Sequence, residues 1–260
     1  SIRIPGAVFF VEPVKDHRFC LIIRTKEPLG ASVTDTDPQA THVPVLPVVA
    51  KDDASKRTAE IINEFVRQAQ ALLKNDRPAN MITFRGAGKK PEILTMEEAY
   101  GVRSVAIPVY PMYRGIARLV GMTIFSQCKD FDEQIRTMEE QWNAFDFFFI
   151  HYKYTDSSGE DGNFEEKVKH LETIDRFVPE ITKLHPDVFV VTGDHSTPAV
   201  LKGHSWHPVP VLLAATTCMP DTAKSFGERE CLRGGIGQIE SRYILPLALA
   251  HAGRLDKFGA

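Results

Sequence analysis

The segment Phe145–Ile150 constrains the fold more than any other part of this sequence, because five of its six residues are apolar. A strand with so few polar residues is covered on both faces, which is typical of a parallel sheet with helices on each side. Residues 163–184 follow with apolar residues at helical spacing, and a second strand-like run covers 187–191. Strands that alternate with amphipathic helices predict an α/β fold with a mostly parallel sheet sandwiched by helices.

The flanking segments extend this pattern in both directions. Strand formers are frequent at 103–109 and at 209–214. We expect 145–150, 187–191 and 209–214 to be neighbours in one sheet. Further helices are predicted at 113–121, at 130–143 and from about 238 to 252.

The first third of the chain is organised differently. Strand formers at 7–11 and 18–24 precede a segment rich in proline, 25–50, which is predicted to be a loop. Residues 54–74 then place apolar side chains three or four positions apart, which predicts a helix. This part of the chain is expected to form a small α/β unit of its own.

A domain change is predicted near residues 80–90. Asn80–Phe84 is expected to form a short strand that ends in the glycine-containing turn Arg85–Gly88. The regular alternation of strands and helices begins only after this point. We therefore expect a smaller α/β domain over 1–84 and the larger domain over 85–260.

The composition excludes several classes of protein. The 31 basic and 34 acidic residues give a net charge of −3, and the absence of a long run of like charge argues against a nucleic-acid or membrane-surface partner. No apolar run reaches the roughly 18–20 residues that a membrane helix needs, and the first residues do not have the pattern of a signal peptide. The four cysteines form no CxxC motif, which is typical of reduced thiols in a cytoplasmic protein.

Titratable side chains gather in three segments at the ends of predicted strands. The first is His151–Gly162, directly after the strand at 145–150, and the second is Thr192–Pro198, after the strand at 187–191. The third, Gly203–Pro208, precedes the strand at 209–214. Functional loops of a parallel sheet leave the carboxyl ends of its strands. Carboxylate and imidazole donors in such loops favour a zinc or manganese site.

Each segment also has an ordinary structural explanation. Asp156 could be a turn residue, and Glu160 could be a solvated loop charge. The Asp194–His195 pair could be a cap beside a surface residue, while His204 and His207 could flank a turn. Because all three segments lie at neighbouring strand ends, a metal site explains them together better than three separate turns do.

Several of these motifs resemble those of a known family. Thr155–Gly162 (TDSSGEDG), Gly193–Pro198 (GDHSTP), His204–Pro210 (HSWHPVP) and Lys257–Ala260 (KFGA) are similar to motifs of the archaeal-type, cofactor-independent phosphoglycerate mutases. That family belongs to the alkaline phosphatase superfamily of metalloenzymes. The resemblance continues upstream through four more segments, which are His17–Arg18, Asp35–Pro38, Asn80–Gly88 and Gly115–Met122.

The resemblance implies a site for two divalent metal ions, Mn or Zn, with Mg as a further possibility. By the family pattern, one ion would be held by Asp156, Glu160 and His204. The other would be held by Asp194 and His195.

Two positions depart from the family pattern. Glu160 stands where the family has a histidine, and a carboxylate is a harder ligand that disfavours zinc. His207 stands where the family has an aspartate. The two departures together could be a compensating exchange of an acid and a histidine between two loops, which makes His207 a further candidate ligand. The family's nucleophilic serine and its N-terminal aspartate ligand have no match in this chain, which resembles the C-terminal two-thirds of the family.

The activity implied by the resemblance is the interconversion of 3-phosphoglycerate and 2-phosphoglycerate in glycolysis, through a phosphoserine. Lys153 is the candidate catalytic residue, since it could reach the phosphoryl group. Arg85 is the candidate substrate-binding residue, because a guanidinium can bind phosphate or carboxylate through two hydrogen bonds. The domain over 1–84 would be an inserted, substrate-binding domain, and 85–260 would be the C-terminal part of the metalloenzyme core.

Two alternatives remain open at this point. A phosphohydrolase of the same superfamily would transfer the phosphoryl group to water, and a non-catalytic relative would have no nucleophile. Since no nucleophile segment is matched, we expect the 260-residue chain alone to lack mutase activity. The small molecule phosphoglycerate is the expected partner, and no feature of the sequence sets an oligomeric state.

Overall fold

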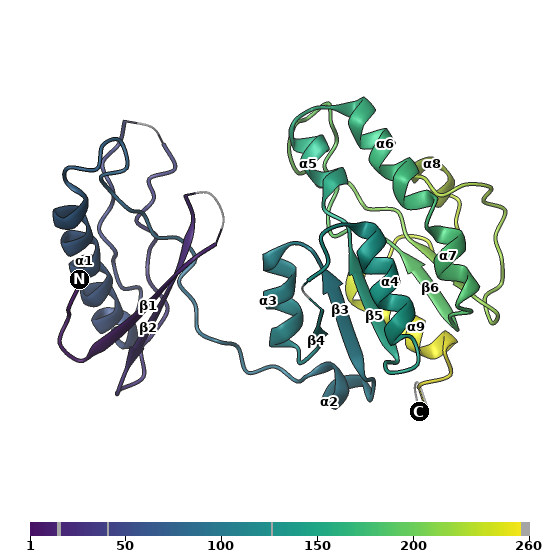
Figure 1. Ribbon diagram of the computed structural model, residues 1–260, viewed down its shortest axis with the longest axis horizontal. Helices are drawn as coiled ribbons and strands as arrows, with labels where there is room; N and C mark the ends of the chain where they lie inside the picture. Colours follow the sequence, from purple (N-terminus) through teal and green to yellow (C-terminus); the bar gives the residue numbers. More distant parts are fainter. Residues whose placement is uncertain (15–16, 41, 126, 256–260) are drawn as a thin grey trace. The chain divides into compact units, whose positions relative to one another are not determined.

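The computed structural model describes residues 1–14, 17–40, 42–125 and 127–255. The chain divides into two compact units, Ser1–Glu92 and Ile93–Ala260 (Figure 1). The motif at 257–260 lies outside the described residues. None of the helices within the described ranges is long and apolar enough to cross a membrane.

The first unit packs a strand hairpin against one helix. Strands β1 (Ala7–Pro13) and β2 (Phe19–Thr25) pair antiparallel, with Ala7 opposite Thr25. Helix α1 (Lys56–Leu73) follows the short 3-10 helix η1 (Asp53–Ser55). Residues at helical spacing on α1 form the core of this unit, as the sequence predicts; they are Ile61, Ile62, Phe65 and Ala69.

The strand expected at Asn80–Phe84 does not form, and this prediction is wrong. Phe84 pairs instead with Thr36, whose Oγ1 accepts a hydrogen bond of 2.6 Å from the Phe84 backbone N–H. The backbone N–H of Thr36 in turn donates to the Phe84 carbonyl oxygen at 2.9 Å. The apolar spacing of Ile82 and Phe84 reflects burial against the core of this unit, which an irregular segment achieves as well as a strand does.

The second unit contains the parallel sheet that the sequence predicts. Its strand order is β4–β3–β5, and both pairings are parallel. All five residues of the central strand are buried, as expected for a strand covered on both faces. The strands are β3 (Ser104–Pro108), β4 (Thr123–Ile124) and β5 (Phe147–His151).

Helices cover both faces of this sheet, so the predicted α/β class is confirmed (Figure 1). Ala106 of β3 packs with Ala117 of α3 (Pro111–Leu119) and Leu249 of α9 (Ile244–His251) on one face. The neighbouring β3 residues, which point the other way, pack against α4 (Phe131–Gln141) through Ile135 and Met138. The remaining short elements are α2 (Met96–Tyr100), α8 (Glu228–Cys231) and η2 (Ser241–Tyr243).

The last two strands form a separate sheet. Strands β6 (Val188–Val191) and β7 (Leu212–Ala215) pair with each other, but they run antiparallel. Within the described residues, neither is hydrogen-bonded to β5, so the expectation of one sheet containing all three segments is wrong. The apolar residues of a strand indicate that it is buried, whereas they specify neither its direction nor its partner.

The helix predicted over 163–184 is interrupted. It consists of α6 (Phe164–Asp175) and α7 (Val178–Lys183), and Pro179 lies in the first turn of α7. Proline is tolerated at that position because the first turn has no hydrogen bond for its missing N–H. The break leaves α6 as a separate helix beside the strand ends that carry the titratable residues.

Candidate metal centre

The first ligand-bearing segment is a helix and not the loop that its composition suggests. Helix α5 (Tyr154–Glu160) begins three residues after β5 ends at His151. Asp156 and Glu160 are four positions apart on this helix, so their side chains lie on the same face. The serines and glycine within α5 are typical of a turn, but Ser158 is buried and its hydroxyl donates to the Tyr154 carbonyl oxygen inside the helix.

The two histidine-bearing segments are joined to each other by backbone hydrogen bonding. Ser196 and Ser205 form an isolated antiparallel bridge, in which the Ser205 N–H donates to the Ser196 carbonyl oxygen at 2.9 Å. Each serine directly follows a histidine, His195 or His204. The bridge therefore places the two imidazoles side by side, with their ring centres 3.8 Å apart.

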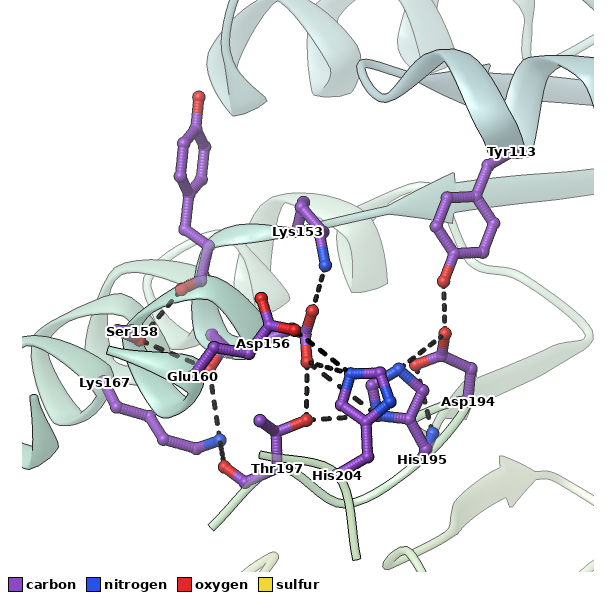
Figure 2. Close-up of polar contacts among 12 residues, drawn as sticks. Tyr113, Lys153, Asp156, Ser158, Glu160, Lys167, Asp194, His195, Thr197 and His204 are labelled. Atoms are coloured by element: carbon purple, nitrogen blue, oxygen red, sulfur yellow. Dashed lines mark hydrogen bonds and ion pairs between the residues drawn. The ribbon is translucent and has the colours of Figure 1, made fainter. Parts of the chain in front are cut away.

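The carboxylate of Asp156 lies close to the imidazoles of both His195 and His204 (Figure 2). Its Oδ1 lies 3.8 Å from Nδ1 of His195 and 3.6 Å from Nε2 of His204. One donor atom from each of these three residues falls within 4.8 Å of the others. That spacing is compatible with three ligands around one divalent ion.

Two more carboxylates extend this group. Oε1 of Glu160 lies 3.4 Å from Nε2 of His204, and Oδ2 of Asp194 lies 3.5 Å from Nε2 of His195. We call Asp156, Glu160, Asp194, His195 and His204 the donor cluster. Three carboxylates and two imidazoles fit the chemistry of a site for Mn, Zn or Mg.

The structure does not bring His207 to the donor cluster. Its side chain is exposed, its Nδ1 shares a hydrogen bond of 2.8 Å with the hydroxyl of Ser205, and its ring stacks on Trp206. Arg85 belongs to the other compact unit, where its Nη1 lies 3.5 Å from Oδ2 of Asp37.

Lys153 and Thr197 hold the carboxylate of Asp156 from two sides. The ammonium of Lys153 forms an ion pair with Oδ2, and the hydroxyl of Thr197 donates to Oδ1 at 2.5 Å. Burial by itself would raise the pKa of Asp156, but these two hydrogen bonds outweigh burial, and the pKa lies below its usual value. The hydrogen bonds from Lys153 and Thr197 therefore favour the ionised form of Asp156, the form in which a carboxylate can bind a cation.

Tyr113 is a site residue that the sequence analysis missed. It comes from α3, its hydroxyl donates to Oδ2 of Asp194, and its ring stacks on His151 at 3.7 Å. Burial raises the pKa of the Tyr113 hydroxyl, and the bond to Asp194 raises it further. Tyr113 is 81 positions away from Asp194, so only the packing of α3 beside the sheet reveals the contact.

Residues 29–251, which include the whole donor cluster, match the family described as the Metalloenzyme superfamily. The chain belongs to this metalloenzyme superfamily. It is 48% identical over 248 residues to a probable 2,3-bisphosphoglycerate-independent phosphoglycerate mutase of Thermotoga neapolitana, which covers 95% of this chain and 62% of the relative. A protein of Thermus thermophilus with the same name is 46% identical over 255 residues, which cover 97% of this chain and 62% of the relative. The chain thus spans less than two-thirds of the length of these metalloenzymes.

Two solved structures share the metalloenzyme fold. The PH0037 protein from Pyrococcus horikoshii aligns with a TM-score of 0.72 and 32% identity, over 80% of this chain and 60% of that one. The cofactor-independent phosphoglycerate mutase from Thermoplasma acidophilum aligns with a TM-score of 0.70 over 97% of this chain and 67% of that one. The second match is only 23% identical, so it supports the fold alone.

Proposed function

We propose that the protein is a cofactor-independent phosphoglycerate mutase, an isomerase that interconverts 3-phosphoglycerate and 2-phosphoglycerate. The observation that carries this proposal is the convergence of Asp156, Asp194, His195 and His204, contributed by three separate segments of the chain. The relatives from Thermotoga and Thermus are named for the same reaction, which supports the proposal.

The donor cluster would hold two divalent ions. Asp156, Glu160 and His204 would bind one ion, and Asp194 and His195 would bind the other. Bound metal would neutralise negative charge on the phosphoryl oxygens, and it would make an attacking hydroxyl group easier to deprotonate. The ligands of the two proposed ions meet at Asp156 and His195, since these two side chains lie 3.8 Å apart.

The donor set favours Mn over Zn. Three of the five donors are carboxylates, which are harder ligands than imidazole or thiolate and suit Mn or Mg. Glu160 is the decisive residue, because it adds a carboxylate to the ion that His204 binds.

Lys153 and Arg85 would handle the substrate. The ammonium of Lys153 already faces the donor cluster through its ion pair with Asp156, and it also lies over the ring of Tyr110. It can contact a phosphoryl oxygen placed next to the metal ions. Arg85, in the turn after Phe84 and within the first compact unit, would bind an anionic group of phosphoglycerate. We propose further that this reaction is a step of glycolysis and that it takes place in the cytoplasm.

An assay coupled to enolase tests the proposal with the protein at its natural length, supplied in turn with Mn, Mg and Zn. We expect conversion of 3-phosphoglycerate without added bisphosphoglycerate. His204→Ala removes a proposed ligand and should lower kcat/KM by at least about 10–100-fold, because loss of a group that merely supports a ligand already costs about that much. His207→Ala is the matched control, since His207 is exposed, stacks on Trp206 and is not among the converging donors.

Two results would contradict the proposal. Equal losses in His204→Ala and His207→Ala would remove the geometric basis for the ligand assignment. A protein that hydrolyses a generic phosphate ester but does not interconvert the phosphoglycerates would be a phosphohydrolase of the superfamily instead.

A further inference from the structure

A partly buried lysine connects the two parts of the donor cluster. Lys167 lies on α6, and its ammonium donates to the carbonyl oxygen of Thr155 at 3.1 Å and to that of Thr197 at 2.8 Å (Figure 2). Thr155 is on α5, whereas Thr197 is in the segment that follows β6. One side chain thus binds two main-chain segments that are distant in the sequence.

Both carbonyl groups belong to residues next to the ligands. Thr155 directly precedes Asp156, so its peptide sets where the Asp156 side chain begins. The hydroxyl of Thr197 contacts Oδ1 of Asp156 at 2.5 Å and Nδ1 of His195 at 3.1 Å. A shift of either carbonyl group would therefore move a ligand of the proposed metal site.

The same carbonyl group of Thr197 is in close contact with α5. A Cβ atom added to Gly159 would lie 2.3 Å from the Thr197 oxygen, which is closer than any side chain could approach. Residue 159 can therefore only be glycine while the two segments keep this separation. Lys167 binds the segments together at the place where they already touch.

The surroundings of Lys167 distinguish it from an ordinary surface lysine. Its two acceptors are main-chain oxygens, and burial holds the pKa of its ammonium below the usual range. Lys169, two positions further along the same helix, pairs with Glu166 at 3.1 Å and is 66% exposed. Replacing Lys167 would leave two inward-facing carbonyl oxygens without their charged donor, whereas replacing Lys169 would not.

We propose that Lys167 is a positioning residue for the metal centre, which fixes α5 and the Thr192–Pro198 segment at the separation that lets Asp156 and His195 share bound metal. This inference rests on the proposed function only in requiring that the donor cluster binds a divalent ion. Lys167 itself contacts neither metal nor substrate.

The test compares Mn binding to the wild-type chain, Lys167→Met and Lys169→Met by isothermal titration calorimetry. The three proteins are first checked for folding by circular dichroism, and binding is measured well below their unfolding temperatures. Lys167→Met should bind Mn about 10–100-fold more weakly, as expected for loss of a group that orients a ligand. Lys169→Met should bind as the wild type does, and Lys167→Arg, which keeps a cationic donor, should recover most of the lost affinity.

Unchanged affinity in a folded Lys167→Met protein would overturn the inference and leave the metal centre intact. A lower unfolding temperature with an unchanged Kd would overturn it too, since Lys167 would then serve stability alone. If Lys167→Met does not fold, Lys167→Gln takes its place, because its amide can still donate to one carbonyl group; a wild-type Kd would again overturn the inference. Wild-type protein that binds no Mn would refute the proposed metal site itself, and the inference with it.

Discussion

The hydroxyl of Thr197 donates a hydrogen bond of 2.5 Å to Oδ1 of Asp156, although 41 positions separate the two residues. Thr197 is 5% exposed, so the bond is shielded from water. The same hydroxyl lies 3.1 Å from Nδ1 of His195. Thr197 therefore orients two proposed ligands with one oxygen atom.

Thr197→Val should weaken metal binding with little change in shape. Valine keeps the volume of threonine but cannot hydrogen-bond to Asp156 or His195, so the affinity for Mn should fall about tenfold. The free energy of unfolding should fall by about 1 kcal/mol. Thr173→Val is the control, because the Thr173 hydroxyl donates within its own helix, to the carbonyl oxygen of Lys169. Titration calorimetry gives the two affinities; equal values would contradict the orienting role.

Glu160→His should change which metal the site prefers. Imidazole is a softer ligand than carboxylate, so the ratio of Zn affinity to Mn affinity should rise roughly tenfold. Competition between the two ions, followed by equilibrium dialysis, measures this ratio. Glu165→His provides the control from the exposed first turn of α6 and should leave the ratio unchanged. A ratio that stays constant in both variants would remove Glu160 from the ligand set.

Asp146 should make the second unit sensitive to acid. Its carboxylate accepts hydrogen bonds from Arg103 and Arg254 at 2.9 Å, and the bond from Arg103 is the main cause that holds the Asp146 pKa well below its usual value. A depressed folded-state pKa stabilises the protein above the unfolded-state pKa of about 3.8, and the contribution is lost as the pH falls further.

Asp146→Asn should consequently lower the unfolding temperature at pH 7 and have less effect at pH 2.5. The loss at pH 7 should be on the order of 1 kcal/mol, since both arginines are partly exposed to solvent. Asp175→Asn, at the exposed end of α6, is the control. Thermal unfolding of the three proteins at both pH values gives the comparison. A difference between wild type and Asp146→Asn that does not shrink in acid would contradict the assignment.

Gly159→Ala should disturb the donor cluster by steric contact alone. The added methyl group would collide with the Thr197 carbonyl oxygen and separate α5 from the segment that carries His195. We expect weaker Mn binding and a lower unfolding temperature. Gly115→Ala in α3 meets nothing within 4 Å and should stabilise its helix by about 0.5–1 kcal/mol. Thermal unfolding with and without Mn distinguishes the two variants. A Gly159→Ala protein with wild-type affinity would show that the close approach is unimportant.

The sequence predicts those parts of the fold in which side-chain spacing reports burial directly. Helix α1 follows from the positions of Ile61, Phe65 and Ala69, and strand β5 from the phenylalanines before Ile150. The antiparallel pairing of β6 with β7 was not predictable, because a run of apolar residues does not indicate in which direction a strand runs relative to its neighbour.

The donor cluster, like the fold, could be predicted only in part from the sequence. Carboxylates and imidazoles at strand ends indicated the three segments, and the family resemblance indicated the five members. The sequence offers no means of telling that His204 contacts Asp156, whereas His207 contacts Ser205 and Trp206. Helix α5 was missed because serine and glycine are typical of turns, and the close approach of Gly159 to the Thr197 segment cannot be read from the sequence. Tyr113 was missed because its role arises only when α3 packs near Asp194.

The bridge between Ser196 and Ser205 closes a short loop. The tip of that loop contains no member of the donor cluster. Val200, near the tip, is 88% exposed. The bridge joins the residues that directly follow His195 and His204, so the exposed tip around Val200 can change in length or sequence while the two imidazoles keep their places. Natural variation should therefore be most frequent at this tip, and a peptide tag or a fluorophore inserted there should leave the donor cluster undisturbed.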